Sequence, residues 1–172
     1  LERDVALYEG EEMSAQMALV KALRLHQVLC GSFTADDGTI HSIPNNRIDA
    51  LLEVLEETSG KSIIWANYIK NITDIKEALT DAYGPESFVC YYGDVSEEDR
   101  VKAIQSFQDP DSPVRFFVGN TQTAGRGITL TEASTCIYFS NNFSLELRQQ
   151  SEDRAHRIGQ RNNVTYVDLV AR

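Results

Sequence analysis

The chain has 172 residues, 42% of them hydrophobic, and a formal net charge of −10 from 26 acidic and 16 basic side chains. This composition is typical of one soluble globular domain with its own core, and it includes neither a membrane-spanning run nor a signal peptide. The acidic balance argues against a membrane-surface role, and it predicts weak nucleic-acid binding unless the basic groups are concentrated.

The cysteines indicate a reducing environment. Cys30, Cys90 and Cys136 are odd in number, far apart and set among apolar residues, which predicts buried, reduced thiols in an intracellular protein. The cysteines and histidines do not have zinc-site spacing, so no metal site is predicted. Because the chain begins with Leu1, we expect it to be a fragment of a longer protein.

The N-terminal part predicts one helix followed by a connector. Residues 1–30 have apolar side chains near helical spacing, including Met13 and Met17. Residues 31–44 form the predicted connector, in which Asp37-Gly38 is a turn signal.

From residue 46 onward, helices and short apolar strands alternate. Such alternation predicts an α/β fold, with a parallel sheet between two layers of helices. Ligands of such sheets lie outside the carboxyl ends of the strands, so we expect function in the loops near Asn67, Tyr92 and Thr121. Helices are predicted over residues 46–58, 70–83, 96–108 and 145–156, and strands over 62–66, 87–91, 114–118, 136–139 and 164–170.

One predicted helix has a clear start signal. Ser96 is followed three residues later by Asp99, which is a capping-box pattern. On this helix we expect Val101, Ile104 and Phe107 to face inward.

The segment QSEDRAHRIGQ, residues 150–160, holds a pair of arginines. Arg154 and Arg157 are three residues apart, on a predicted helix that Ser144 can cap and that we expect to end at Gly159. Two guanidiniums on one helix face form a permanent positive site, and each can bind phosphoryl oxygens in a bidentate manner.

Arg-x-x-Arg alone is not specific. Its commoner explanation is surface ion pairing with neighbouring acids, here Glu146, Glu152 and Asp153. The wider sequence context is therefore needed to choose between the two readings.

The segment TQTAGRGITLT, residues 121–131, follows a predicted strand. Gly125 and Gly127 allow the backbone to approach a ligand closely, and Thr121 and Thr123 offer hydroxyls to phosphate oxygens. On its own, this pattern is also explained by a tight turn with a glycine bulge.

In this order, the two segments resemble motifs V and VI of superfamily 2 helicases and translocases, and the wording of residues 150–160 resembles the Snf2 family in particular. IIWANY, residues 63–68, resembles motif IV, and Arg100 fits the block that follows it. Arg126 stands where Snf2 proteins often carry an uncharged residue, and it is either a further phosphate contact or a plain surface residue.

The resemblance implies a role for each site residue. Arg154 and Arg157 are the expected catalytic arginine fingers, which reach the β- and γ-phosphates of ATP. The expected nucleotide-binding residues are Gln150, Gly125 and Gly127, and the expected nucleic-acid contacts are Thr121, Asn67 and Thr123.

The resemblance also implies a domain organisation. Residues 1–44 would be a helix and connector leading from a missing first lobe, and residues 45–172 would be the C-terminal RecA-like helicase lobe. ATP and Mg²⁺ would be held mainly by the missing N-terminal RecA-like lobe of the same chain, and double-stranded DNA would be bound through its backbone. We expect the isolated fragment to be inactive. We also expect the protein to be cytoplasmic if prokaryotic or viral, nuclear if eukaryotic, and not to bind membranes.

Gly60-Lys61-Ser62 looks like the end of a P-loop, but Leu55 stands where that pattern needs glycine. The segment also joins a predicted helix to a strand, the reverse of the P-loop order, so we reject it as a phosphate site.

Two other functions remain open: the C-terminal lobe of a superfamily 2 RNA helicase, and a non-catalytic α/β interaction module whose arginines only form ion pairs. Trp65 and Tyr68 could stack on bases, although a core position is the commoner one for Trp65.

Overall fold

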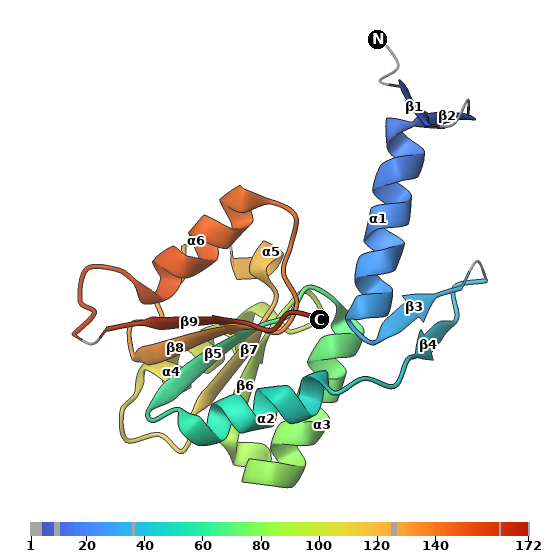
Figure 1. Ribbon diagram of the computed structural model, residues 1–172. Coiled ribbons are helices and arrows are strands. Elements are labelled where there is room, and N and C mark those ends of the chain that lie inside the picture. The colour runs from blue at the N-terminus through green and yellow to red at the C-terminus, as the bar shows by residue number, and fades with distance from the viewer. Residues whose placement is uncertain (1–4, 9–10, 36, 125–126, 162, 172) are drawn as a thin grey trace. The chain divides into compact units, whose positions relative to one another are not determined.

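The computed structural model describes residues 5–8, 11–35, 37–124, 127–161 and 163–171. The chain divides after Asn45 into two compact units, an N-terminal unit of residues 1–45 and a larger unit of residues 46–172. Figure 1 shows the elements of both units.

In its described residues the N-terminal unit contains two short hairpins and one helix: β1 (Val5–Tyr8), β2 (Glu11–Ser14), α1 (Ala15–Leu29), β3 (Ser32–Thr34) and β4 (Ile40–Ser42). The prediction of one helix over residues 1–30 is therefore wrong for β1 and β2. These strands pair antiparallel, with Val5 opposite Ser14, and this pairing satisfies backbone groups that a helix would otherwise satisfy. The predicted connector contains β3 and β4, and in its turn the Asp37 carboxylate accepts the Thr39 N–H at 2.8 Å.

The larger unit contains the predicted helices and strands. The strand β8 begins at Ala133 rather than at Cys136, and the segment after β7 forms an extra short helix. In order, the elements are α2 (Arg47–Glu57), β5 (Lys61–Trp65), α3 (Ile69–Tyr83), β6 (Phe88–Tyr91), α4 (Glu97–Gln108), β7 (Phe116–Gly119), α5 (Thr121–Ala124), β8 (Ala133–Tyr138), α6 (Leu145–Ala155) and β9 (Thr165–Asp168).

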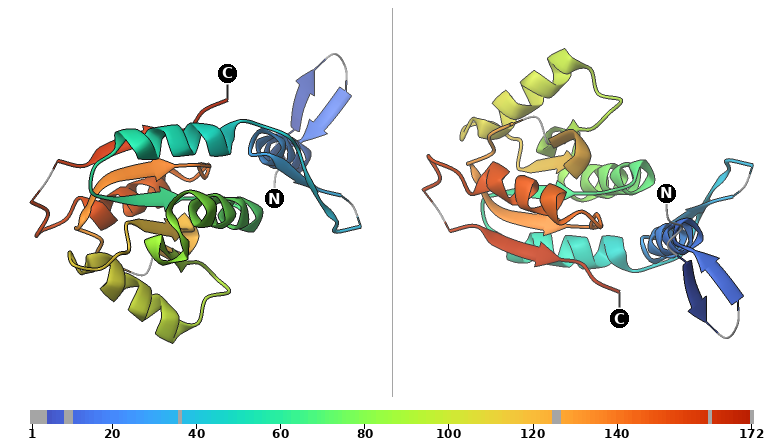
Figure 2. Two further views of the ribbon diagram at one scale, coloured as in Figure 1. Left: turned by 90° about the horizontal axis from the view of Figure 1, so that it is seen from below. Right: turned by 90° about the horizontal axis from the view of Figure 1, so that it is seen from above.

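The five strands of the larger unit form one sheet in the order β6-β7-β5-β8-β9, and every neighbouring pair is parallel. At the centre of the sheet, Ile63 of β5 lies opposite Phe117 of β7 and Cys136 of β8. Figure 2 shows helices on both faces of the sheet. The predicted α/β fold, with a parallel sheet in three αβα layers, is confirmed.

Two apolar layers cover the sheet. Ile64 of β5 packs with Leu51 and Leu55 of α2 and with buried residues of α3, whereas Ile63 packs with Phe107 of α4 and a buried residue of α6. Alternate residues of a strand point to opposite faces, so the single strand β5 serves both layers. Trp65, which is fully buried on the α4 and α6 side, occupies the predicted core position.

The helix α4 has the predicted cap but a different inward face. The Ser96 Oγ accepts the Asp99 N–H at 3.1 Å, and Phe107 is fully buried. Val101 is 49% exposed, so its predicted inward position is wrong. The buried positions are Ala103 and Phe107, four residues apart, and Val101 lies outside the stripe that they define.

The three cysteines are free, with Cys30 and Cys136 buried and Cys90 half-buried. Burial raises the pKa of Cys136 from 9.0 to about 12. The folded state therefore favours the neutral thiol, and this preference contributes stability only while the pH lies below the raised pKa.

This predicts a specific alkaline loss of stability. The Cys136 contribution is complete below the unfolded pKa of 9.0 and is lost as the pH rises toward about 12. Urea unfolding should show that, between about pH 8 and about pH 11, the free energy of unfolding falls by about 2 kcal/mol more in the unsubstituted protein than in Cys136→Ala. Parallel stability curves for the two proteins would contradict this assignment.

Candidate nucleotide and nucleic-acid sites

The helix α6 places the two predicted arginine fingers differently from the sequence expectation. Ser144 caps the helix as predicted, its Oγ accepting the Leu147 N–H at 3.3 Å. The helix ends at Ala155, because His156 adopts a non-helical φ of −89° and ψ of 82°. Arg154 is therefore in the last helical turn and Arg157 lies beyond it, so the expected shared helix face and the expected stop at Gly159 are wrong.

Both arginines nevertheless lie against the segment that includes Gly127. The exposed Arg157 donates from Nη1 to the Gly127 carbonyl at 3.3 Å and to the Thr129 hydroxyl at 3.1 Å. The Arg154 carbonyl accepts the Leu130 N–H at 2.8 Å, and the buried Arg154 Nε has no hydrogen-bond partner in the described structure. The two segments that resemble motifs V and VI thus meet here. Gly125 and Arg126 lie outside the described residues.

Glu152 of α6 pairs with a different arginine. Arg148 donates from Nε to Glu152 at 2.6 Å and from Nη2 to Asp168 at 3.1 Å. Burial alone would lower the pKa of Arg148, but the hydrogen bonds to Asp168 and Glu152 raise it. Within the described ranges neither Arg154 nor Arg157 forms an ion pair, so the ion-pair reading holds for Arg148 alone.

Gln150 has a partner on its own helix. Its Nε2 donates to the Glu146 carboxylate at 3.0 Å, one helical turn away. This bond uses one of the two N–H donors of the Gln150 amide, which leaves the second donor for a phosphate oxygen.

A second group of polar residues lies at the carboxyl ends of β5, β7 and β8. Asn67 is held on three sides: its N–H donates to Ser140 Oγ at 2.8 Å, its carbonyl accepts from Asn120 at 2.9 Å, and its side-chain Oδ1 accepts from Asn142 at 3.1 Å. Ser140 in turn donates to Asn71 Oδ1 at 3.1 Å. The predicted contact Asn67 is therefore fixed in place by neighbours.

Most residues of that group were not predicted from the sequence. Asn120, Ser140 and Asn142 each follow directly or closely after a strand, and this position was the available signal. These three residues lie outside the segments that resemble the family motifs, so the resemblance did not point to them.

The predicted threonines begin the short helix α5. Thr121 is 4% exposed, and its buried hydroxyl has no partner among the described residues. The N–H of Thr123 donates to the Asn120 carbonyl at 3.1 Å. A buried hydroxyl that forms no hydrogen bond costs free energy, so its presence at Thr121 needs an explanation.

The two groups lie near opposite ends of the sheet. Gln160 donates to the carbonyl of Ala133, the first residue of β8, and to that of Ala155, which fixes the end of α6 beside the start of that strand. Asn67 and Thr121 follow the ends of β5 and β7. The carboxyl ends of the strands, where we expected function, therefore hold Asn67 and Thr121 but not Arg154 and Arg157.

At the start of β5, the Lys61 side chain is hydrogen-bonded to backbone carbonyls. Its Nζ donates to the carbonyls of Phe107 at 2.9 Å and Asp109 at 2.6 Å, at the end of α4. Gly60 joins α2 to β5, so the rejection of a P-loop at this place is confirmed.

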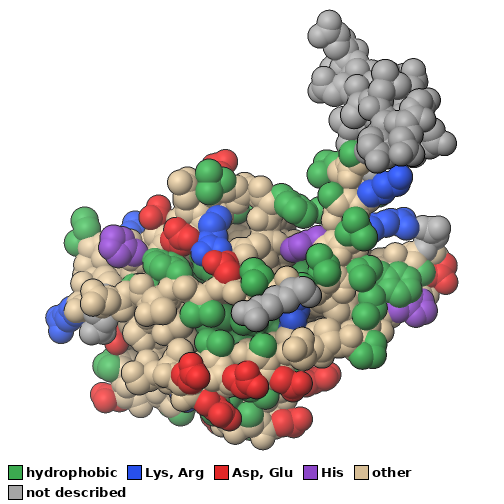
Figure 3. All heavy atoms as spheres, viewed as in Figure 1, with side chains coloured by type: hydrophobic (Ala, Val, Ile, Leu, Met, Phe, Trp, Pro, Cys, Tyr) green, Lys and Arg blue, Asp and Glu red, His purple; other side chains and the backbone are tan. Residues whose placement is uncertain are grey.

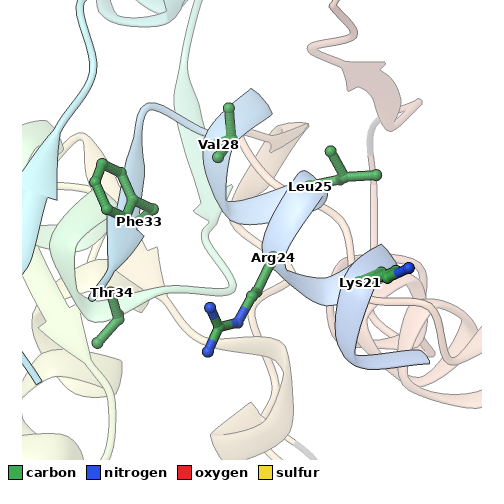
Figure 4. Close-up of a pocket in the computed structure, with 6 residues that line it drawn as sticks. All are labelled: Lys21, Arg24, Leu25, Val28, Phe33 and Thr34. Atoms are coloured by element: carbon green, nitrogen blue, oxygen red, sulfur yellow. The ribbon is translucent and has the colours of Figure 1, made fainter. Parts of the chain in front are cut away.

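Two other surface features of the described residues do not involve the predicted site residues. Figure 3 shows acidic side chains gathered over α2, where Asp49, Glu53, Glu56 and Glu57 are exposed. In the N-terminal unit, Figure 4 shows a hollow between α1 and β3, lined by Lys21, Arg24, Leu25, Val28, Phe33 and Thr34. Of the helices in the described part of the chain, none is both long and apolar enough to cross a membrane.

Comparisons with known proteins agree with the fold and the motif order. The family profile described as the helicase conserved C-terminal domain matches residues 46–159. The probable ATP-dependent DNA helicase CHR12 of Arabidopsis thaliana is 30% identical over 124 residues, which cover 72% of this chain and 11% of that protein. The ISWI chromatin-remodeling complex ATPase ISW1 of Saccharomyces cerevisiae is 28% identical over 148 residues, covering 80% of this chain and 12% of that protein.

Solved structures show the same likeness. The Sulfolobus solfataricus SWI2/SNF2 ATPase core in complex with dsDNA has a TM-score of 0.69 at 27% identity, covering 90% of this chain and 32% of that one. The C-terminal part of the Fun30 ATPase domain has a TM-score of 0.66 at 26% identity, covering 75% of this chain and 44% of that one. The chain spans about a tenth of the length of the curated relatives it matches. It belongs to the helicase conserved C-terminal domain family, and it is the C-terminal RecA-like lobe of a Snf2-type, superfamily 2 protein.

Proposed function

We propose that this chain is the second motor lobe of an ATP-dependent, Snf2-type DNA translocase, and that it is inactive on its own. In this proposal Arg154 and Arg157 are arginine fingers for ATP, and Thr121, Thr123 and Asn67 contact DNA phosphates. The observation that carries the proposal is the exposed Arg157 guanidinium, which lies outside every ion pair of the described residues. The names of the similar proteins, a DNA helicase and a chromatin-remodeling ATPase, support it.

The surroundings of Arg157 fit a triphosphate. In the described part of the chain its hydrogen bonds use Nη1 alone, which leaves Nε and Nη2 for phosphate oxygens. Gly127 has a φ of 72° and no atom within 4 Å of the place where a Cβ would stand, so a phosphate can come close to its backbone. Bound ATP supplies the phosphoanhydride that is hydrolysed, and the arginines stabilise the negative charge that develops on it.

Mg²⁺ does not fit this lobe. Across the described ranges no group of three or more His, Cys, Asp or Glu side chains is placed to hold a metal ion. Lys61, the only lysine in a P-loop-like context, binds carbonyls of α4 instead. We therefore assign most of the ATP and Mg²⁺ binding to an N-terminal RecA-like lobe of the same chain, which is why this lobe alone is expected not to hydrolyse ATP.

The second group of residues fits weak contacts with a DNA backbone. Asn67 keeps its Nδ2 donor while three neighbours hold it, and Thr121 carries a hydroxyl for which the described residues supply no partner. Uncharged donors of this kind position a protein on phosphates without reading sequence. Since the exposed face of α2 is acidic, DNA contacts are expected at the strand ends instead.

The alternatives are less well supported. The SWI2/SNF2 core with a TM-score of 0.69 was solved in complex with dsDNA, which favours DNA over RNA. An interaction module whose arginines only form ion pairs would not need Arg157 exposed. If this lobe belongs to a chromatin-remodeling protein of a eukaryote, we expect the intact protein to be nuclear.

In the intact protein, Arg157→Ala should lower the kcat of DNA-stimulated ATP hydrolysis by about 10³-fold or more, because an arginine finger acts mainly on the transition state. DNA affinity should change by less than about twofold. Arg161→Ala is the matched control, since Arg161 is an exposed arginine shortly after Arg157. Full turnover by Arg157→Ala would remove its assigned role.

Purified residues 1–172 should show no DNA-stimulated ATP hydrolysis in a phosphate-release assay, because the lobe lacks a P-loop. Mixing with a separately produced N-terminal lobe is the positive control. Robust hydrolysis by the lobe alone, abolished by a substitution within it, would reveal a complete site and contradict the two-lobe assignment.

Thr121→Val should weaken DNA binding by the intact protein by about fivefold or more while leaving its folding stability equal or slightly higher, because valine replaces a buried hydroxyl that has no partner with a methyl group. Fluorescence anisotropy and urea unfolding measure the two effects. Thr80→Val, which alters an exposed helical threonine, is the control. Unchanged DNA affinity in Thr121→Val would show that its hydroxyl does not meet DNA.

A further inference from the structure

The helix that carries Arg154 is held mainly by polar contacts. Of the eleven residues of α6, only Leu145, Leu147 and Ala155 are apolar, and Leu145 is 70% exposed. Apolar burial fixes most helices on a sheet, so α6 requires other anchors to fix its rotation about its own axis.

The strongest of these anchors is Arg148. Its guanidinium lies 3.5 Å from the centroid of the Tyr138 ring and donates to Asn141 Oδ1 at 2.9 Å. Both of its terminal nitrogens bind Asp168, with Nη1 donating to Oδ1 and Nη2 to Oδ2. A bidentate fork fixes direction as well as distance. Arg148 therefore ties α6 to the ends of both β8 and β9.

Two further hydrogen bonds join α6 to the same two strands, β8 and β9. Ser151 hydrogen-bonds the Tyr138 hydroxyl at 2.7 Å, and the Tyr166 hydroxyl donates to the Glu152 carbonyl at 3.3 Å. At the far end, the only backbone bond that joins Arg154 to the rest of the lobe runs from the Leu130 N–H, among the described residues. A rotation of α6 would move Arg154, about 9 Å along the helix from Arg148, with the rest of the helix.

We propose that Arg148 and Asp168 are positioning residues: their ion pair sets the rotation of α6 and thereby the aim of Arg154 and Arg157 at the nucleotide. This inference rests on the proposed function of those two arginines. The pair touches neither nucleotide nor DNA in this assignment, and it acts through the helix. The hydrogen bond from Arg148 also lowers the pKa of Asp168, so the carboxylate stays charged at neutral pH.

The test uses the intact parent protein with Asp168→Asn, Arg148→Gln and the charge exchange Arg148→Asp with Asp168→Arg. In each single variant the kcat for ATP should fall by about tenfold or more, because a misplacement of about 1 Å can cost about a hundredfold in rate. The KM for ATP should change by less than about threefold, since the P-loop lobe still binds the nucleotide. The exchanged pair should recover kcat to within about threefold of the parent.

A second measurement reports the position of α6 directly. Because the Leu130 N–H donates to the Arg154 carbonyl, hydrogen–deuterium exchange of the segment containing Leu130 should be about tenfold faster in Asp168→Asn, and exchange in β5 should be unchanged. Lys102→Gln, which removes the exposed Lys102–Asp99 pair on α4, is the control and should leave both readouts unchanged.

The outcomes separate this inference from the proposed function. Full kcat in Asp168→Asn, or loss of kcat that the charge exchange does not recover and that leaves Leu130 exchange unchanged, overturns the positioning role. If Arg148→Gln does not fold, Asp168→Asn decides, because the Asp168 side chain is 39% exposed and is replaced by a side chain of the same size. Normal turnover in Arg157→Ala would instead overturn the proposed function itself.

Discussion

The double-sided burial of β5 is the constraint on which the larger unit depends. Ile63 and Trp65 enter the layer below α4 and α6, and Ile64 and Ala66 enter the layer below α2 and α3. A shift of this strand by one residue would exchange the two sets, so that each apolar layer would receive the side chains that now pack in the other. Because β7 and β8 pair with β5 on its two sides, its register also fixes where their ends lie. The polar group around Asn67 and the start of β8 are therefore both placed by a strand that carries no functional residue.

The structure of the larger unit was predictable from sequence where it depends on local patterns. It was less predictable where it depends on contacts between residues that are distant in the chain. Apolar runs identified the strands, and the Ser96 and Ser144 caps identified helix starts, because these signals act within a few residues. The hairpin of β1 and β2 was missed, because its pairing leaves no helical or alternating signature strong enough to override the spacing of Met13 and Met17. The helix predicted over residues 145–156 is confirmed within one residue, whereas the stop expected at Gly159 was wrong for a related reason. Gln160 and Leu130 bind the last carbonyls of the helix, and no local pattern encodes those bonds.

The arginines of this acidic lobe divide into those that serve the fold and those that do not. Arg115 donates to the carbonyls of Leu55 and Thr58 at the end of α2, and Arg100 donates to the carbonyl of Gly93. In such places a guanidinium satisfies backbone acceptors that lie outside a helix or strand. Sequence cannot make this division, since a structural and a functional arginine look alike in it. The resemblance to the family motif is the basis on which Arg154 and Arg157 are proposed to be functional, and the contacts of Arg148 assign it to the fold.

Under the proposed function, this lobe supplies charge to a nucleotide that another lobe holds, and this sets a requirement for its arginines. Its arginines must be rigid enough to aim, yet they meet their target only when the two lobes close. Apolar packing would make α6 rigid at the cost of committing it to one position, because close-packed interfaces do not adjust continuously. The bidentate Arg148–Asp168 pair fixes the rotation of α6, whereas the single hydrogen bonds around it can exchange with water and permit small adjustments. The polar attachment of α6 through Arg148, Ser151 and Glu152 is thus the kind of support that a shared active site requires.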